Sequence, residues 1–349
     1  MRTAVIINCV CLAALAFSAG RAEDVAGRRA AFLKLIERPK VPSAPAAEES
    51  PLPDGIVQVK FSFASEPGER VPGILIRRDS PGRLPAVIAL HGTGGNKEGQ
   101  IPLLKRLAAE GFTAIAIDGR WHGARSRSGT GSADYSEAIL RTYRTGAGHP
   151  FLYDTVWDVL RLIDYLETRS DVDPSRIGLI GFSKGGMETY LAAAVDPRIA
   201  VAVPCIGVQS FRWALDNDAW QSRVGTFQKA IDGAASDRGE PKIDAPFVRA
   251  FYDRIAPGIY SDFDGPAMLP LIVPRPLLLI NGDRDGRTPM GGLQECAAAA
   301  RRAYSAAGRS DRFVLHIQKD TAHQVRPEAI DLAIAWFTKY LTAAAASSR

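Results

Sequence analysis

The chain has 349 residues, of which 46% are hydrophobic and 23% are charged, a globular composition with enough length for one large α/β domain or two small ones. Its formal net charge is +5 at pH 7, and the basic residues are scattered along the sequence. This distribution excludes the concentrated basic surface on which nucleic-acid binding depends.

Residues 1–22 have the pattern of a secretory signal peptide. Arg2 gives the positive start, residues 5–17 are apolar apart from Asn8, and Gly20-Arg21-Ala22 precedes the cleavage site that we favour. The apolar core is shorter than the ~20 residues of a membrane-spanning helix, so an uncleaved anchor is the less favoured alternative. We expect an exported protein, periplasmic or extracellular, without a membrane anchor.

Two cysteines lie beyond the signal peptide, Cys205 and Cys296. An oxidising compartment permits a disulfide between them, although we favour two buried free thiols. The Cys and His residues do not have the spacing of a metal site. We therefore expect neither a metal nor another cofactor.

Residues 23–54 form an N-terminal region that precedes the predicted catalytic domain at 55–345. Its first part, residues 23–37, has the pattern of a short amphipathic helix. Residues 38–54 contain five prolines among Ala, Ser and Glu, a composition that predicts an extended linker or an arm on the surface.

Strands and helices then alternate. Residues 56–63 and 71–76 predict a hairpin of partly exposed strands, whereas 86–90 and 113–117 are wholly apolar and predict strands buried on both faces. A helix is expected between the buried strands at 99–110, and a long amphipathic helix at 153–169.

A loop rich in charge follows the strand at 113–117. It runs from Asp118 to Ser126 and contains Arg120, His122 and Arg125. Arg120 and His122 are candidates for binding a polar or anionic substrate. The alternative is that Asp–Arg pairs stabilise the loop itself.

The most informative segment is Gly181-Phe182-Ser183-Lys184-Gly185-Gly186. It follows the apolar run 176–180 and precedes a helical segment at 187–195. Strand, tight turn and helix form the context of a nucleophile elbow, in which flanking glycines relieve crowding around a serine that projects from the turn. Ser183 is therefore the candidate nucleophile.

Another buried strand is expected at 199–203, and the segment after it, at about 207–272, interrupts the alternation. Its many aromatic residues and its length argue against a structureless loop. We expect a mostly helical insertion, or cap, over the carboxyl edge of the sheet, where ligands bind in open α/β folds. Trp213 and Trp220 are candidate pocket walls, although packing within the insertion explains them equally well.

A serine hydroxyl needs a base that takes its proton. The chain has five histidines: His91, His122, His149, His316 and His323. His316 is held within a predicted strand at 312–317, whereas His323 lies in the loop after that strand, at the carboxyl edge. His323 is therefore the candidate base.

Helices are expected at 291–306 and 327–341.

An acid should orient the imidazole. Asp283 and Asp285 both follow the predicted strand at 276–280 and lie between Ser183 and His323 in the chain. We favour Asp285, and Asp283 is the alternative.

Acyl transfer also needs amide donors where negative charge develops on the carbonyl oxygen. The Lys184 amide, which follows the serine, is one. The second is expected from the glycine-rich loop His91-Gly92-Thr93-Gly94-Gly95, with Thr93 preferred and Gly94 as the alternative. A phosphate-binding loop is a less favoured interpretation of the same glycines.

The loop at 91–95, the segments 181–186 and 282–289, and His323 together resemble the α/β-hydrolase superfamily, and most closely its dienelactone hydrolase-like and acetyl xylan esterase-like branches. The resemblance covers about Ile56 to Leu341. It implies a mostly parallel sheet of about eight strands with helices on both faces and a helical insertion after the sixth strand. It also favours Asp285, because the acid of this superfamily commonly lies three residues after a strand-ending glycine.

Dienelactone hydrolases proper use a cysteine nucleophile, so Ser183 favours an esterase. Secreted relatives of this type often act on carbohydrate esters. We therefore predict an exported serine esterase that acts on a small-molecule or carbohydrate ester. The alternatives are an exopeptidase or amidase with the same residues, and a non-catalytic binding protein with this fold.

Overall fold

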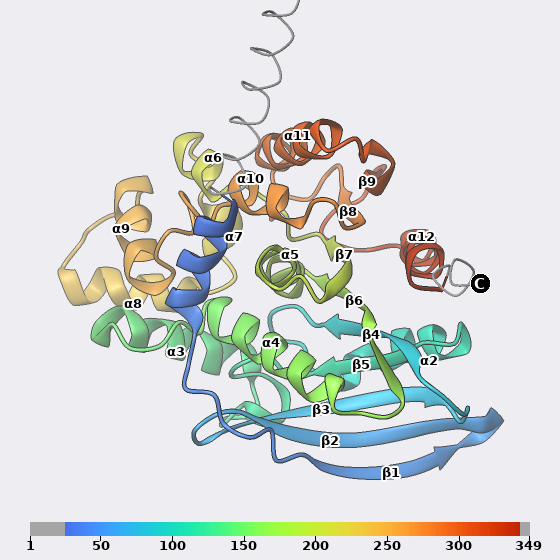
Figure 1. Ribbon diagram of the computed structural model, residues 1–349. Helices are drawn as coiled ribbons and strands as arrows, with labels where there is room; N and C mark the ends of the chain where they lie inside the picture. Colours follow the sequence, from blue (N-terminus) through green and yellow to red (C-terminus); the bar gives the residue numbers. More distant parts are fainter. Residues whose placement is uncertain (1–24, 343–349) are drawn as a thin grey trace, which may run out of the picture.

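A nine-stranded sheet forms the centre of the computed structural model, which describes residues 25–342 (Figure 1). The predicted signal peptide lies outside the described residues. Within them, the strands are β1 (Ala46–Leu52), β2 (Ile56–Glu66), β3 (Glu69–Arg78), β4 (Leu84–Leu90), β5 (Thr113–Ile117), β6 (Val172–Phe182), β7 (Ile199–Cys205), β8 (Leu277–Gly282) and β9 (Phe313–Gln318). Their order is β1-β2-β3-β5-β4-β6-β7-β8-β9. The six strands β5, β4, β6, β7, β8 and β9 pair in parallel. The pairs β1–β2, β2–β3 and β3–β5 are antiparallel.

Helices cover both faces of the sheet, which explains why β4 and β5 are apolar along their length. One core cluster joins the sheet to α2 (Ile101–Ala109) and α12 (Pro327–Phe337). The other joins it to α4 (Tyr153–Glu167), α5 (Lys184–Val195) and α11 (Met290–Ala306). The predicted α/β fold is confirmed.

The segment between β7 and β8 is helical, as predicted. It contains α6 (Phe211–Asp216), α7 (Gln221–Val224), α8 (Gln228–Arg238), α9 (Ala245–Ile255), α10 (Gly265–Met268) and the short turn η4 (Leu269–Ile272). Helices α8 and α9 pack on α3 (Gly131–Thr145), a helix that the sequence analysis did not predict. The insertion is therefore joined to the loops that precede β6.

The Pro-rich arm differs in part from the prediction. Residues 37–45 form neither helix nor strand, but β1 pairs antiparallel with β2, with Ala46 opposite Ser62 and Leu52 opposite Ile56. Pro51 is tolerated because β1 is an edge strand, where a missing N–H costs no ladder bond. The extra strand makes nine rather than eight, and the insertion follows the seventh strand rather than the sixth.

A helix at residues 25–36 fastens the N-terminal region to the main body. Phe32 is fully buried, and its ring lies 4.9 Å edge-on from the rings of both Tyr153 and Phe263. The Arg29 Nε donates to the Ala194 carbonyl over 2.8 Å. The helix is thus part of the core beside α4 and α5.

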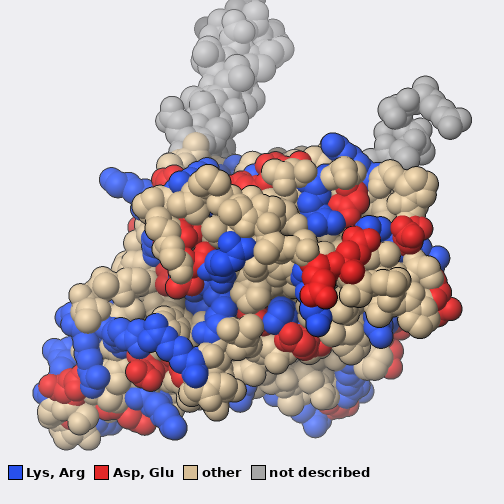
Figure 2. Space-filling model, turned by 90° about the horizontal axis from the view of Figure 1, so that it is seen from below, with Lys and Arg blue, Asp and Glu red and all other residues tan. Residues whose placement is uncertain are grey.

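The surface carries charges of both signs. Figure 2 shows Lys and Arg interspersed with Asp and Glu on one face, with Lys and Arg denser toward its left end. Cys205 and Cys296 are both buried free thiols, as we favoured. Among residues 25–342, no helix has the length and apolar character needed to cross a membrane.

Replacement of Phe32 by alanine tests the docking of the 25–36 helix. We expect Phe32→Ala to lower the free energy of unfolding by about 3–5 kcal/mol, because a large ring leaves a cavity between α4 and the insertion. Urea denaturation measures the change. The exposed neighbour Lys34 supplies the control, and Lys34→Ala should change stability by no more than about 0.5 kcal/mol. Equal effects of the two substitutions would contradict the docking.

Candidate active site

Ser183 occupies the turn between β6 and α5 in a conformation that few residues adopt. Its φ is 55° and its ψ is −111°. A Cβ on Gly181 would overlap the Gly185 carbonyl, and one on Gly185 would overlap the Leu90 carbonyl of β4. Only glycine permits this approach, so the two glycines let the turn close and present the Ser183 hydroxyl at the carboxyl edge of the sheet.

His323 and Asp285 complete a hydrogen-bonded line with Ser183. The His323 Nε2 lies 2.8 Å from the Ser183 Oγ, and the His323 Nδ1 lies 2.8 Å and 2.9 Å from the two Asp285 carboxylate oxygens. A carboxylate only accepts, so Nδ1 carries the proton and Nε2 is free to accept from the serine hydroxyl. This is the arrangement that a general base requires.

Asp285 is held by its own loop. Its side chain is fully buried, and its Oδ1 accepts hydrogen bonds from the amides of Arg287 (2.9 Å) and Thr288 (3.2 Å). Three donors, two amides and His323, thus surround the carboxylate. They fix its orientation toward the imidazole.

Asp283, the alternative acid, has a different position. Its carboxylate accepts from the amides of Asp320 and Thr321, each at 3.0 Å, and these hydrogen bonds lower its pKa. It therefore braces the loop that leads to His323 and does not contact the imidazole. Of the two predicted candidates, the structure brings Asp285 to His323.

The Gly92–Thr93 peptide lies beside the serine. A Cβ on Gly92 would stand 3.4 Å from the Ser183 Cβ. The His91 Nε2 accepts from the Gly119 amide at 3.0 Å, so the His91 Nδ1 donates to the Gly92 carbonyl at 2.8 Å. In a trans peptide the next N–H points opposite to the carbonyl. His91 therefore fixes the direction of the Thr93 amide.

Lys184 contributes both backbone and side chain. It is the first residue of α5, so its N–H has no acceptor within the helix. Its side chain is buried, and the Nζ lies 2.7 Å from the Glu188 Oε1 on the next turn. This ion pair holds the first turn of α5, while the amide stays next to the serine.

Two buried histidines, His91 and His122, lie near the Ser183–His323–Asp285 line but are not part of it. His122 is fully buried, its Nδ1 lies 2.7 Å from the Arg120 carbonyl, and its ring is 5.1 Å from that of His91. Burial and, next, the charge of Lys184 lower the pKa of His91 to about 3 and that of His122 to about 2. Both rings are therefore neutral at physiological pH.

Arg120 belongs to an ion-pair network, which was the alternative interpretation of its loop. Its guanidinium contacts both Asp158 oxygens at 2.9 Å and 3.0 Å, and it also pairs with Glu66. Arg125 donates to the same Asp158 at 2.6 Å. Although burial raises the pKa of Asp158, the two arginines hold it below its usual value. Arg120 is thus committed to carboxylates of its own chain, and His122 is fully buried, although its Nε2 has no hydrogen-bond partner.

Asp118 joins the two loops at this edge of the sheet. Its buried carboxylate accepts from the Lys97 amide (2.8 Å), the Lys97 Nζ (2.8 Å) and the Ala124 amide (2.9 Å). The loop after β4 is thereby tied to the loop after β5. This contact supports the position of the Gly92–Thr93 peptide.

The two tryptophans of the insertion make local contacts. The Trp213 ring lies against the first turn of α11, where a Cβ on Gly291 would overlap it. The Trp220 Nε1 donates to Asp218 at 2.9 Å, and its ring is partly buried. Both sets of contacts agree with packing of the insertion, the alternative interpretation of the two tryptophans.

Arg223 is a residue that the sequence analysis missed. It is 1% exposed, and its Nη2 donates to the Arg287 carbonyl (2.9 Å) and the Thr288 Oγ1 (3.3 Å). These are the residues whose amides hold Asp285. Arg223 thus fastens the insertion to the loop of the acid, and no local sequence signal distinguishes it from a surface arginine.

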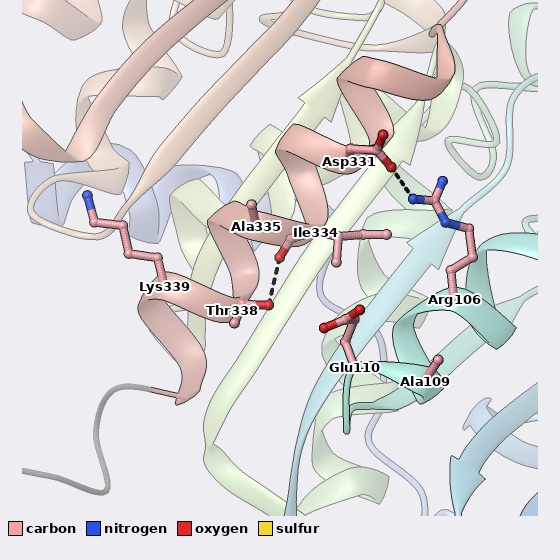
Figure 3. Close-up of a pocket in the computed structure, with 8 residues that line it drawn as sticks. All are labelled: Arg106, Ala109, Glu110, Asp331, Ile334, Ala335, Thr338 and Lys339. Atoms are coloured by element: carbon pink, nitrogen blue, oxygen red, sulfur yellow. Dashed lines mark hydrogen bonds and ion pairs between the residues drawn. The ribbon is translucent and has the colours of Figure 1, made fainter.

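A groove of about 670 Å³ lies elsewhere, between α2 and α12 (Figure 3). Arg106 pairs with Asp331 across it, and the Thr338 hydroxyl donates to the Ile334 carbonyl at 3.0 Å. The residues that line this groove do not include Ser183, His323 or Asp285. In the described part of the chain, no group of His, Cys, Asp and Glu residues is arranged to hold a metal ion.

Comparison with known proteins gives a family. Residues 73–308 match the model of the family described as glucuronyl esterase, fungi. The YtaP protein of Bacillus subtilis is 26% identical over 286 residues, which cover 77% of this chain and 84% of YtaP. The 4-O-methyl-glucuronoyl methylesterase of Thermothelomyces thermophilus is 26% identical over 290 residues, which cover 80% of this chain and 67% of that enzyme.

The solved structures agree in fold. The acetyl xylan esterase from Paenibacillus sp. R4 superposes with a TM-score of 0.65 at 21% identity, covering 91% of this chain and 95% of that one. The family match includes Ser183 and Asp285, and it ends before His323. These comparisons confirm the predicted resemblance to α/β-hydrolase serine esterases of the dienelactone hydrolase-like type.

The depressed pKa of His122 predicts an acid-sensitive fold. Below pH 6.5 the unfolded chain takes up a proton at this position and the folded chain does not until about pH 2, so stability falls as the pH drops. Between pH 7 and pH 5 the loss amounts to about 2 kcal/mol. Urea denaturation at both pH values should show a drop about 2 kcal/mol larger for the wild type than for His122→Phe. Equal drops would mean that His122 is charged in the folded protein.

Proposed function

This chain belongs to the glucuronyl esterase family, and on that premise we propose that it is an exported serine esterase that cleaves a carboxylic ester of a uronic-acid sugar through an acyl-enzyme. It is a carboxylic ester hydrolase with the α/β-hydrolase fold. One observation carries the mechanism, namely the 2.8 Å contact between the His323 Nε2 and the Ser183 Oγ, backed by Asp285.

Acylation follows from this contact. His323 takes the hydroxyl proton as Ser183 attacks the ester carbonyl, and the imidazolium then gives that proton to the departing alcohol. Asp285 keeps the proton-bearing Nδ1 in place and stabilises the positive ring. Water, activated by the same His323, then hydrolyses the acyl-enzyme and releases the acid.

The negative charge of the tetrahedral intermediate needs donors that are already in position. We assign this role to the Thr93 and Lys184 amides. Support comes from the His91 hydrogen bond that turns the Thr93 N–H away from the Gly92 carbonyl, and from the position of Lys184 at the N-terminus of α5. That end of a helix also favours negative charge.

The uronic-acid ester is the substrate that the family supports best. The curated relative from Thermothelomyces thermophilus is named a 4-O-methyl-glucuronoyl methylesterase. A signal-like segment at 1–22 fits an enzyme that meets such a substrate outside the cytoplasm. An amidase and a non-catalytic protein are less favoured, because the family consists of esterases and Ser183 is paired with a base.

The two neighbouring aspartates provide a matched test of the mechanism. We expect Ser183→Ala to abolish hydrolysis of 4-nitrophenyl acetate, and Asp285→Asn to lower kcat/KM by about 10³–10⁴-fold, because the amide favours the wrong tautomer of His323. Asp283→Asn should keep kcat/KM within about tenfold, since an amide oxygen still accepts one loop N–H. Steady-state kinetics at pH 7 measure all three. A larger loss for Asp283→Asn than for Asp285→Asn would reverse the assignment.

A substrate panel tests the chemical class. The wild type should release methanol from methyl D-glucuronate, and Ser183→Ala should not. Relative to methyl D-glucuronate, the wild type should turn over acetylated sugars more slowly. It should turn over amides at least about 10³-fold more slowly, because an amine is a poorer leaving group than an alcohol. Mass spectrometry of the released acid gives the rates. Preferential turnover of amides would refute the esterase assignment, and preference for acetylated sugars would refute the uronic-acid ester.

A further inference from the structure

Trp121 stands where the backbone normally takes glycine. The His122 amide donates to the Gly119 carbonyl at 3.1 Å, which closes a turn with Trp121 at its third position. The φ of Trp121 is 64°. Turns of this kind take Gly or Asn there, and a bulky aromatic side chain costs about 1–3 kcal/mol. The fold thus holds a strained indole at the end of β5.

Two arginines lie over this indole. The guanidinium carbon of Arg127 is 5.1 Å from the ring centroid, and that of Arg141 is 5.2 Å away. Arg141 has an exposed carboxylate partner, Glu137, at 3.5 Å, and such a pair contributes little. The donor groups of both arginines are therefore available to a ligand at the surface.

Two grooves meet at Trp121. One has a volume of about 260 Å³ and is lined by Trp121, Arg127, Ser128, Asp134, Glu137 and Arg141. The other, of about 220 Å³, shares Trp121 and Arg141 and continues toward Thr142 and Pro150. We call this pair of cavities the Trp121 groove. The two cavities thus share one indole and one guanidinium, and the second is also lined by Arg38, Glu66, Arg120 and Asp154.

The charges of the first cavity balance. Arg127 and Arg141 are opposed by Asp134 and Glu137. The Asp134 Oδ2 accepts hydrogen bonds from Ser126 and from the amides of Arg127 and Ser128, so this carboxylate is fixed in place. A balanced set of fork-shaped donors and carboxylate acceptors around an indole suits vicinal hydroxyls on a ring with an apolar C–H face. It does not suit an anion, which the two carboxylates would repel.

The groove lies on the same edge of the sheet as Ser183. β5 neighbours β4, and β4 neighbours β6, so the ends of β5 and β6 are about 10 Å apart. Contacts bridge this interval. A Cβ on Gly94, next to Thr93, would touch Ser132 at 3.7 Å, and one on Gly131 would lie 3.4 Å from the Trp121 carbonyl.

We propose that the Trp121 groove binds a neutral sugar residue of the glycan that carries the scissile ester. This inference rests on the proposed function, since it places the rest of the substrate beside the site at Ser183. The part of the Trp121 indole that lines the cavities beside the two arginines contacts the C–H groups of the sugar, and Arg141, Glu137 and Asp134 bind its hydroxyls. The site gives a role to the tryptophan that occupies this strained turn.

Trp121→Gly removes the indole and suits the positive φ, so the variant should fold. Arg141→Gln removes one donor fork from an exposed position. The control is Arg144→Gln, on the same helix, whose guanidinium pairs with Asp237 at 2.6 Å outside the groove. Circular dichroism and thermal melting verify the fold of each variant.

Calorimetric binding of xylotetraose and cellotetraose tests the site without catalysis. The wild type and Arg144→Gln should bind one of these neutral probes with equal affinity, and Trp121→Gly and Arg141→Gln should bind it about tenfold more weakly or not at all. Absence of binding of both probes to the wild type would overturn the proposal. So would undiminished affinity in Trp121→Gly.

Kinetics separate this result from the proposed function. With methyl D-glucuronate, Trp121→Gly should keep kcat/KM within about twofold of the wild type. With the same methyl ester carried on a xylo-oligosaccharide, KM should rise about tenfold and kcat should stay the same. If the wild type cleaves neither ester but binds the neutral probe through Trp121, the proposed function fails and the sugar site stands. Equal losses on both esters would contradict the sugar site.

Discussion

The close approach of backbone around Ser183 is the constraint on which the site depends. Ser183 adopts a positive φ only because Gly181 and Gly185 let β6, α5 and β4 meet without side chains between them. Gly207, just after β7, repeats this requirement, since a Cβ there would overlap the Ser183 carbonyl. Three neighbouring strands therefore fix one serine. The strain of that residue is compensated by the packing of the whole sheet centre.

Buried polar contacts extend this constraint to the loops. Asp118 ties the loop after β4 to the loop after β5, neutral His91 sets the direction of the Thr93 amide, and Arg223 joins the insertion to the loop of Asp285. The first contact is buried and the other two are partly buried, and a buried polar group without a partner would cost about 1–3 kcal/mol. The elements around Ser183 are thus positioned before a substrate arrives, which is what electrostatic stabilisation of a transition state requires.

The sequence predicted the centre of the molecule well and its periphery less well. β4 and β5 are short apolar runs that only a doubly covered strand explains. β1 was hidden by Pro51, which an edge strand tolerates, and α3 by its polar sequence, because it is buried by the insertion rather than by the sheet. Motif spacing placed Ser183 and His323 at the same edge. It left Asp283 and Asp285 two residues apart, and only the loop geometry brings Asp285 to the imidazole. Arg223 has no local sequence pattern, since its role arises from contacts 64 and 65 positions away in the chain.

The central claim is that Ser183 is a nucleophile activated by His323. Reaction with a fluorophosphonate probe tests it most directly, because such a probe modifies only a serine whose hydroxyl is deprotonated during attack. The account predicts a single modified tryptic peptide, residues 177–184, in the wild type and an unmodified peptide in His323→Asn. Labelling at another serine, or equal labelling of the His323→Asn variant at Ser183, would contradict it.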